Sequence, residues 1–590
     1  MIEITYEDNK LLVRFPYNEL DLIKAKNIPD RRWVKSKKVW SCRPTLANIK
    51  YLEQAWPRAF YSKEANNIRN SVIDRENNRL STLESKSGNI DTSWLDGVNF
   101  KMPPMKHQKI ALTLAKDKNA FAYFMDQGTG KTKTLIDDAA YLYRKNEIDA
   151  LIVITINSVK TNWVITPSLK DDPDDMDAID SHLPDDIPYT KMVWSSKQTK
   201  EYKKEWAIFE KDINSKDKRK LIILACNIES LKVGRAFKFY EDLCKRFRVM
   251  IVIDESTIIG RPGSGNTTQS LKLRKLCKYA RILSGTPIIK SPLKAYSQFQ
   301  FLDEDILGFG SFYSFRNNYC NMGGFEGRQV LSYKNLDDLQ TRIATSSYRV
   351  EKKDCLDLPP QIFEKRRIEL TDEQLKEYKR MQEELIAENS EKEIVEATIV
   401  LSQILRLQQI VGGYLPKVDG EGVLPIIPKE KNPKFLEVLN ILENSGDQRV
   451  LIWSRFTHEI NDLVDLLQEK GYNFLPFYGE LNDKEKISTR KRFVRDQEIK
   501  GIVGNPAAGG LGIDEFKEAS IVIYLSNSFD TEKRKQSEDR AHRKGSEKHE
   551  SITYYDIIAP NTVDIKIMQV MRSNVKVSAA ILKDEWKEWI

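Results

Sequence analysis

The sequence predicts an α/β fold with two lobes, each built on a parallel sheet, a helical insertion between them and a small α+β module at the N-terminus. Short apolar runs recur from residue 101 onward with helical segments between several of them, and the same alternation resumes near residue 450. This alternation is typical of parallel sheets covered by helices on both faces. The length of 590 residues also exceeds what one hydrophobic core can hold.

The changes of pattern along the chain set the expected domain boundaries. Residues 1–60 are predicted to form the small α+β module, and residues 61–100, rich in asparagine and serine, a polar linker. The first α/β lobe is expected at 101–290. The remaining segments are a mostly helical insertion and bridge without clear buried strands at 291–430, the second lobe at 431–575 and a C-terminal tail at 576–590.

The composition, with 40% hydrophobic and 31% charged residues, is that of a soluble globular protein. No apolar run reaches 18 residues and the N-terminus lacks a secretory signal, so we expect neither a membrane span nor export. The six cysteines form no CxxC pair and the five histidines do not cluster with them, which favours a reducing cytoplasm over a zinc site or disulfide framework. The net charge of +8 permits a polyanionic partner. Eight aspartates between Asp171 and Asp186 are interpreted as a solvated surface loop.

The strongest local signal is a glycine-rich segment between a buried strand and a helical pattern. It reads Gln127-Gly128-Thr129-Gly130-Lys131-Thr132. Glycines let such a loop wrap a phosphate, and the N–H groups at the helix start attract anions. Lys131 is expected to bridge the β- and γ-phosphates of ATP and Thr132 to hold Mg²⁺. The alternative is a chance glycine-rich turn, which the strand–loop–helix context disfavours.

A pair of carboxylates, Asp254-Glu255, ends the apolar run at 249–253. The carboxyl ends of buried parallel strands are where open α/β sheets bind ligands. Asp254 is expected to reach Mg²⁺ and Glu255 to orient and polarise the attacking water. The alternative, an acidic cap at a strand-to-loop turn, is equally plausible for the pair alone. The cap alternative becomes less plausible when the pair is considered together with Lys131, which follows a second strand.

Basic residues recur at helical spacing near the end of the second lobe. Gln536, Arg540 and Arg543 are four and three residues apart, so on a helix they share one face. Two arginines on one face can bind phosphate oxygens with fixed geometry. An arginine that reaches the γ-phosphate contributes roughly 10³–10⁵ in rate to phosphoryl transfer. An exposed basic helix is the alternative.

Two small-residue turns complete the set. Ser284-Gly285-Thr286 follows a short apolar run in the first lobe, and the segment from Asn505 to Ile513 follows the strand pattern at 501–503 in the second. Small residues let the backbone approach a bound strand or nucleotide closely. Taken alone, each segment is equally well an ordinary turn or flexible loop.

In this order, the motifs resemble those of superfamily 2 helicase-type ATPases, specifically the Swi/Snf branch, over roughly residues 100–575. Further segments that carry the resemblance are Met105 to Gln108, Leu151 to Thr155 with Ser158 and Trp163, Cys226 to Ser230 and Val450 to Phe456 with Gly479. Three segments depart from the branch: Ser256 follows the two carboxylates, Ile258-Ile259-Gly260 stands where a basic sequence is usual, and Ser546 stands where a glutamine is usual. None of these departures removes a catalytic group.

The resemblance implies two RecA-like lobes that close on one ATP with Mg²⁺. Arg540 and Arg543 would complete the site on closure, and Ser284, Gly285 and Thr286 would couple hydrolysis to movement. The implied nucleotide contacts are Gln108, residues 127 to 132 and Gly512. Of these, Gln108 would contact adenine. The implied DNA contacts are Ser158, Trp163, Asn227, Arg455, Gly479, Asn505, Ala508 and Gly509. Contacts to the DNA backbone imply little sequence preference and a strong dependence on salt.

The first 60 residues resemble the HARP module of annealing helicases, which helps such motors recognise forked DNA. Trp33 and Trp40, on two short strands joined by a basic turn, carry this resemblance together with Phe15-Pro16-Tyr17 and Ile28-Pro29. The alternative is an ordinary α+β appendage whose tryptophans fill its own core. Without the long tails of eukaryotic remodellers, the chain is expected to be a compact bacterial or phage enzyme.

The leading functional hypothesis is an ATP-dependent DNA translocase that anneals strands or regresses forks. One alternative is a helicase that separates strands of DNA or RNA. The other is an ATP-gated clamp that displaces proteins from DNA without sustained movement. Replication or recombination proteins are further candidate partners, and the oligomeric state is left open.

Overall fold

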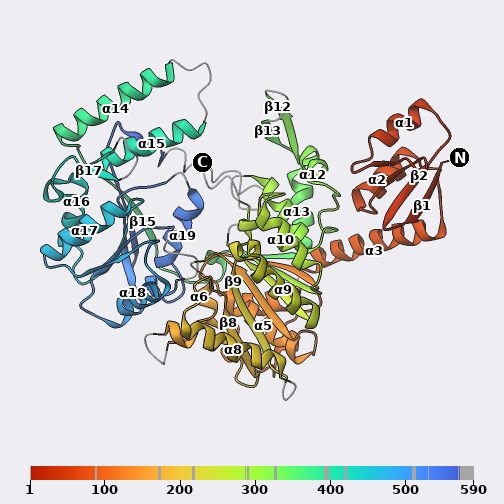
Figure 1. The fold of residues 1–590 in the computed structure, drawn as a ribbon, viewed down its shortest axis with the longest axis horizontal. Coiled ribbons are helices and arrows are strands. Elements are labelled where there is room, and N and C mark those ends of the chain that lie inside the picture. Colours follow the sequence, from red (N-terminus) through yellow and green to blue (C-terminus); the bar gives the residue numbers. More distant parts are fainter. Residues whose placement is uncertain are drawn as a thin grey trace.

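The computed structural model describes residues 2–571, apart from a set of short gaps. The gaps are 87–89, 158, 171–174, 216–218, 286, 289–290, 325–328, 391–396, 418–421, 508–512, 529, 566 and 569–570. Two lobes lie side by side, and the N-terminal module stands beside the first of them (Figure 1). None of the helices in the described part of the chain is long and apolar enough to cross a membrane.

The first lobe is built on a seven-stranded sheet with the order β14-β6-β11-β10-β7-β9-β8, in which every neighbouring pair is parallel. Its strands are β6 Ala120–Met125, β7 Ala150–Thr155, β8 Tyr189–Val193, β9 Leu221–Asn227, β10 Val249–Asp254, β11 Tyr279–Leu283 and β14 Ser347–Val350. Alternate residues of β6 enter different cores: Phe121 and Tyr123 belong to one, and Ala122 and Phe124 to the other. Successive side chains of a strand point to opposite faces, so both faces of this sheet are buried, as predicted.

Helices cover both faces of the first sheet. They are α4 Lys106–Ala115, α5 Lys131–Arg144, α6 Lys160–Trp163, α7 Ala178–His182, α8 Lys200–Asn214, α9 Gly234–Arg246, α10 Gly265–Arg274 and α11 Ala295–Leu302. The α5 helix begins at Lys131, directly after Gly130 of the glycine-rich segment, in the strand–loop–helix order that the sequence predicts. Its inner residues, among them Leu135, Ile136 and Ala139, are fully buried.

The second lobe contains a six-stranded parallel sheet with the order β15-β22-β21-β18-β20-β19. Its strands are β15 Gln361–Arg367, β18 Arg449–Trp453, β19 Phe474–Phe477, β20 Gly501–Gly504, β21 Ala519–Tyr524 and β22 Ile552–Ile558. Its main helices are α16 Pro433–Glu443, α17 Thr457–Glu469, α18 Asp483–Arg495 and α19 Thr531–Ala541. The predicted pair of RecA-like parallel-sheet lobes is confirmed.

The segment between the lobes holds helices and small hairpins. They are α12 Phe312–Tyr319, β12 Cys320–Gly323, β13 Gln329–Tyr333, α13 Leu336–Thr345, α14 Asp372–Ser390, α15 Ala397–Val411, β16 Tyr414–Pro416 and β17 Val423–Pro425. The sequence predicts no clear buried strand in this segment, but the segment does contribute strands to the main sheets. It supplies β14 to the first sheet and β15 to the second. Both are edge strands with partly exposed residues, so neither shows the continuous apolar run of a central strand.

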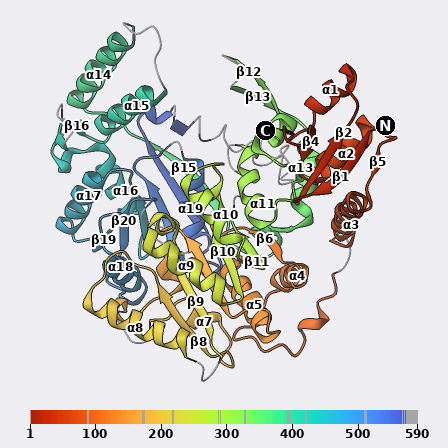
Figure 2. The ribbon, with the colours of Figure 1, turned by 45° about the vertical axis from the view of Figure 1, so that its right-hand side comes forward.

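The N-terminal module is a five-stranded sheet with the order β3-β4-β2-β1-β5 and two helices, which confirms its predicted α+β class. Its elements are β1 Glu3–Glu7, β2 Lys10–Arg14, α1 Glu19–Lys26, β3 Arg32–Val34, β4 Val39–Cys42, α2 Leu46–Ala55 and β5 Phe60–Tyr61. The long helix α3 Lys63–Lys86 leads toward the first lobe and packs against α13 (Figure 2). Arg43 pairs with Glu304 at 2.9 Å, and Ser314 of α12 donates a hydrogen bond to the Pro29 carbonyl at 2.6 Å, so the module is held against the segment between the lobes.

Candidate functional site

A cavity of about 450 Å³ lies between the two lobes. The carboxyl ends of β6 and β10 open toward it, at the edge where parallel sheets bind ligands. Its lining from the first lobe includes Gln127, Gly128, Gly130, Lys131, Thr132, Asp254 and Glu255, and its lining from the second lobe includes Arg490, Arg495, Asp514 and Arg543. The structure therefore brings most of the predicted catalytic residues around one space.

The glycine-rich loop needs its glycines. Gly128 and Gly130 have φ angles of +85° and +86°, which side chains rarely tolerate. A Cβ at Gly128 would lie 2.6 Å from the Cβ of Arg543 in the second lobe, and a Cβ at Gly130 would collide with the Gln108 amide. The Lys131 ammonium donates to the Met125 carbonyl at 2.9 Å. The loop is thus packed between both lobes, with its lysine on the inside.

Gln108 supports this loop. Its amide oxygen accepts from the Met105 N–H at 2.9 Å, and its amide nitrogen donates to the Thr129 carbonyl at 3.1 Å. The neighbouring His107 ring also contacts that carbonyl, at 2.8 Å. Contact between Gln108 and adenine stays a prediction.

The two carboxylates are deeply buried beside Lys131. Asp254 accepts hydrogen bonds from the Trp163 indole N–H at 2.9 Å and from the Glu255 N–H at 3.0 Å. Burial raises the pKa of both acids, that of Glu255 to about 8, although the nearby Lys131 opposes the shift. A carboxyl with a pKa near the working pH can orient a water molecule and accept its proton.

Arg543, in the turn after α19, lines the same cavity, and the charge of Arg540 on α19 interacts with the Glu255 carboxylate that also lines it. Arg540 is 2% exposed, and burial together with Arg543 lowers the pKa of Arg540 to about 9. Its Nη1 atom is buried without a hydrogen-bond partner among the described residues. Arg543 donates to the Ile513 carbonyl at 2.9 Å and pairs with Asp514. A buried guanidinium nitrogen without a hydrogen-bond partner suits a phosphate oxygen.

Gln536 connects α19 to the carboxylate turn. Its amide donates to Glu532 at 3.3 Å, and Glu532 accepts from the Thr257 hydroxyl of the first lobe at 3.0 Å. A further contact between the lobes joins Arg490 of α18 to Asn162 at 2.7 Å. The lobes are therefore closed on each other around the cavity.

These residues fit a nucleoside triphosphate with its magnesium ion. The glycine loop and Lys131 form a cradle for phosphates, and Arg540 offers a buried donor without a partner. Thr132 lines the cavity together with Asp254, so a hydroxyl and a carboxylate, both oxygen ligands that Mg²⁺ accepts, stand on the same side.

The predicted coupling residues follow β11. Ser284 is fully buried and its hydroxyl lies 3.5 Å from the Glu255 carboxylate. The Gly285 carbonyl accepts from Arg349 at 2.7 Å. Thr286 lies outside the described residues. A coupling role for this turn stays a prediction.

One predicted DNA contact needs correction. Trp163 is 1% exposed and its indole N–H donates to Asp254, so it orients the Asp254 carboxylate and does not lie on a surface open to DNA. The sequence could not indicate this, because the two residues are 91 positions apart. Four other residues predicted to bind DNA or nucleotide lie outside the described part of the chain: Ser158, Ala508, Gly509 and Gly512.

Two other predicted DNA contacts meet at an open cavity of about 500 Å³ in the second lobe. Arg455 and Asn505 line it, and the Asn505 amide donates to the Arg455 carbonyl at 2.8 Å. Gly479 is exposed at the end of β19, and Asn227 at the end of β9 donates to Glu229 at 2.9 Å. Their contacts with DNA stay a prediction.

The two tryptophans of the N-terminal module form a pair. Trp33 on β3 lies opposite Trp40 on β4, with ring centroids 5.3 Å apart. Trp40 packs against the module core, whereas Trp33 is 50% exposed. The alternative that the tryptophans fill the module's own core therefore holds in part for Trp40 and not for Trp33. The likeness to a HARP module stays a prediction.

The acidic segment is solvated only in part: Asp185 and Asp186 are exposed, as predicted, whereas Asp175 and Asp177 are buried. Asp175 is 1% exposed and pairs across the lobes with Arg495 at 3.2 Å, and Asp177 caps α7 and accepts from the Ile165 N–H at 2.7 Å. The basic partners of Asp175 lie on α18 in the other lobe, so a local charge count could not reveal them. Residues 171–174 lie outside the described residues.

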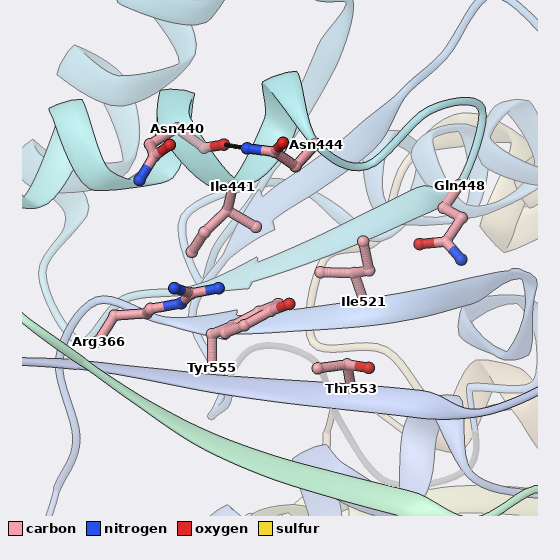
Figure 3. Close-up of a pocket in the computed structure, with 8 residues that line it drawn as sticks. All are labelled: Arg366, Asn440, Ile441, Asn444, Gln448, Ile521, Thr553 and Tyr555. Atoms are coloured by element: carbon pink, nitrogen blue, oxygen red, sulfur yellow. Dashed lines mark hydrogen bonds between the residues drawn. The ribbon is translucent and has the colours of Figure 1, made fainter.

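A smaller cavity of about 150 Å³ in the second lobe lies under α16 (Figure 3). It is lined by Arg366, Asn440, Ile441, Asn444, Gln448, Ile521, Thr553 and Tyr555. The Arg366 guanidinium stands 4.9 Å above the Tyr555 ring and is paired with Glu364. None of the predicted catalytic residues, all of them described in the structure, lines this cavity, so we place the chemistry in the cavity between the lobes.

Sequence reasoning missed Arg349 and Lys352, which lie at the end of β14 and just beyond it. Both contact the Asp126 carboxylate next to the phosphate loop. The local sequence around these residues shows a basic cluster after a weak strand pattern. Such a pattern is typical of a solvent-exposed surface, so it did not indicate a functional site.

Comparison with known proteins agrees with this geometry. A family model described as the SNF2-related domain matches residues 115–412, and one described as the helicase conserved C-terminal domain matches residues 431–545. An uncharacterized ATP-dependent helicase of Mycoplasma genitalium, MG018, is 27% identical over 326 residues, which cover 54% of this chain and 29% of that protein. The human lymphoid-specific helicase is 28% identical over 152 residues, which cover 25% of this chain and 18% of that protein.

The similarity to these curated relatives is partial, because the matched part spans less than a third of the length of each. Among solved structures, the SWI2/SNF2 ATPase core of Sulfolobus solfataricus in complex with dsDNA is 22% identical, with a TM-score of 0.35, over 82% of this chain and 95% of that one.

Proposed function

This chain belongs to the SNF2-related family, and from that premise we propose that it is a DNA-dependent ATPase that hydrolyses ATP between its two lobes and moves along duplex DNA. One observation carries the proposal: catalytic groups of both lobes line a single cavity, with the phosphate loop of one lobe in contact with Arg543 of the other. A site assembled from two lobes can link each hydrolysis event to their relative movement.

The residues divide the chemistry among them. Lys131 and the loop N–H groups bind the phosphates, and Arg540 and Arg543 stabilise the charge that develops on the transferred phosphoryl group. Glu255 orients the attacking water and takes its proton. Thr132 and Asp254 would hold Mg²⁺, which would supply further charge neutralisation. Trp163 holds Asp254 in its orientation through the indole hydrogen bond.

On DNA, we propose that the motor remodels duplex or forked substrates by annealing or fork regression. Support comes from the exposed Trp33 beside basic residues of the N-terminal module, where a splayed base could stack. Arg455 and Asn505 in the second lobe are suited to phosphate contacts.

A triplex-displacement assay tests the movement. The substrate is a duplex that carries a third strand far from the loading end, and Lys131→Ala is the blank. The proposal expects the third strand to be released with ATP and retained with the variant. ATP hydrolysis without release would replace the motor with a clamp that does not travel.

A further inference from the structure

A buried lysine between the lobes has no part in the chemistry described so far. Lys352 begins the short 3-10 helix Lys352–Asp354 that follows β14, and it is 8% exposed. Its backbone N–H donates to Asp126 at 3.2 Å. The main chain at Lys352 is therefore fixed to the residue that immediately precedes the phosphate loop.

The side chain of Lys352 crosses to the second lobe. Its ammonium pairs with the carboxylate of Asp539 and donates to the His542 carbonyl at 2.6 Å. Asp539 lies on α19 next to Arg540, and the side chains of Lys352 and Asp539 are only 10% and 13% exposed. A buried ammonium and a buried carboxylate are stable together and costly apart, so this contact favours one placement of α19.

On the first lobe, the same network reaches the turn after β11. Arg349 stands 3.3 Å from the Asp126 carboxylate and donates to the Gly285 carbonyl at 2.7 Å. The Asp126 main chain supports the phosphate loop, because its carbonyl accepts from the Thr129 hydroxyl at 2.7 Å. One buried polar network therefore joins the phosphate loop, the Ser284–Gly285 turn and α19.

We infer that Lys352 is a positioning residue that holds α19, and with it Arg540, in register with the phosphate loop. This inference rests on the proposed ATPase function. Because Lys352 is anchored to the loop through its main chain and to α19 through its side chain, opening the lobes must break its pairing with Asp539. Asp539 without that cation would become an anion available to the adjacent Arg540, which would draw the arginine away from a phosphate.

Steady-state ATP hydrolysis tests this role. Lys352→Met keeps a long apolar side chain but removes the cation, and we expect kcat to fall about ten- to a hundredfold, the range that misplacing a catalytic group produces. The KM for ATP should change by less than about threefold, since the phosphate loop itself is intact. Lys352→Arg keeps the cation and should retain more activity than Lys352→Met.

Two further variants separate positioning from a general loss of structure. Asp539→Asn should reproduce the kcat defect, and the double variant Lys352→Met with Asp539→Asn should be no worse than the more damaged single variant, because both changes break one interaction. Lys353→Ala is the matched control, since the Lys353 side chain is 67% exposed. Additive losses in the double variant, or a kcat for Lys352→Met equal to that of the control, would overturn the inference.

Hydrogen–deuterium exchange gives a readout that does not need activity. In the full-length protein, peptides covering residues 531–541 should exchange faster in Lys352→Met and Asp539→Asn than in wild type or Lys353→Ala. Unchanged exchange in this helix would overturn the inference even if the wild type hydrolyses ATP. Conversely, a wild type without ATPase activity but with faster exchange in the variants would refute the proposed function and leave the contact supported.

Discussion

Arg540 offers the sharpest test of the two-lobed site. In the fold, burial and the neighbouring Arg543 lower the pKa of Arg540 to about 9, more than three pKa units below that of a free arginine. At about 1.4 kcal/mol per pKa unit, keeping the guanidinium charged costs on the order of 4 kcal/mol. A pH of 7 lies below both the folded and the unfolded value, so the full cost applies at neutral pH.

The variant Arg540→Gln removes this charge and keeps most of the stem. We expect kcat to fall by roughly 10³-fold or more, in line with the loss of an arginine from other phosphoryl-transfer sites. The melting temperature of the nucleotide-free protein should stay level or rise, because an unsatisfied buried charge has been removed. Stabilisation by Mg²⁺ and a non-hydrolysable ATP analogue should be smaller than in wild type.

ATPase kinetics and thermal unfolding on the same preparations measure both effects. Lys535→Gln, an exposed position on the same helix, is the control and should behave as wild type. The assignment fails if Arg540→Gln turns over ATP within tenfold of wild type. It also fails if the variant loses activity only in step with a large drop in melting temperature, since that would make Arg540 a structural residue.

Three other predictions address the phosphate loop, the base and the N-terminal module. Lys131→Ala should abolish turnover while DNA binding in a filter assay stays largely intact; loss of both would point to misfolding. Burial raises the pKa of Glu255 to about 8. Between about pH 5 and 8 the folded protein therefore keeps a proton on Glu255 that the unfolded chain has released. Because the unfolded state binds fewer protons over this range, the stability of the fold falls as pH rises. The melting temperature should therefore depend less on pH in Glu255→Gln than in wild type over this range. The same pH dependence in both proteins would contradict the raised pKa of Glu255. Trp33→Ala should weaken fork-stimulated hydrolysis more than duplex-stimulated hydrolysis; an equal loss on both substrates would remove the case for fork recognition by the module.

The parts of this molecule that the sequence predicted are those with a local signal. The strand–loop–helix context of residues 121–143 identifies the phosphate loop, and an apolar run that ends in Asp254-Glu255 identifies a strand end at the ligand edge of the sheet. Both sheets follow from the same apolar runs. Central strands buried on both faces carry a continuous signal that edge strands such as β14 and β15 lack.

What the sequence did not predict depends on contacts between distant segments. Trp163 was expected on the DNA surface, but it orders Asp254. Asp175 was expected in solvent, but its cationic partners lie on α18 of the other lobe. The pairing of Lys352 was likewise not predictable from local sequence, because its partner Asp539 is 187 positions away. Such pairings depend on how the two lobes pack against each other, and a short stretch of sequence carries no information about that packing.

We propose that DNA stimulates ATP hydrolysis at one site to which both lobes contribute residues. The most direct measurement is ATP hydrolysis by the purified protein with matched single-stranded DNA, duplex DNA, forked DNA and RNA, with Lys131→Ala as the blank. We predict strong stimulation by duplex or forked DNA, which would then justify strand-annealing assays. Stimulation by single strands or RNA alone would contradict the account and indicate a strand-separating helicase or an RNA-dependent enzyme.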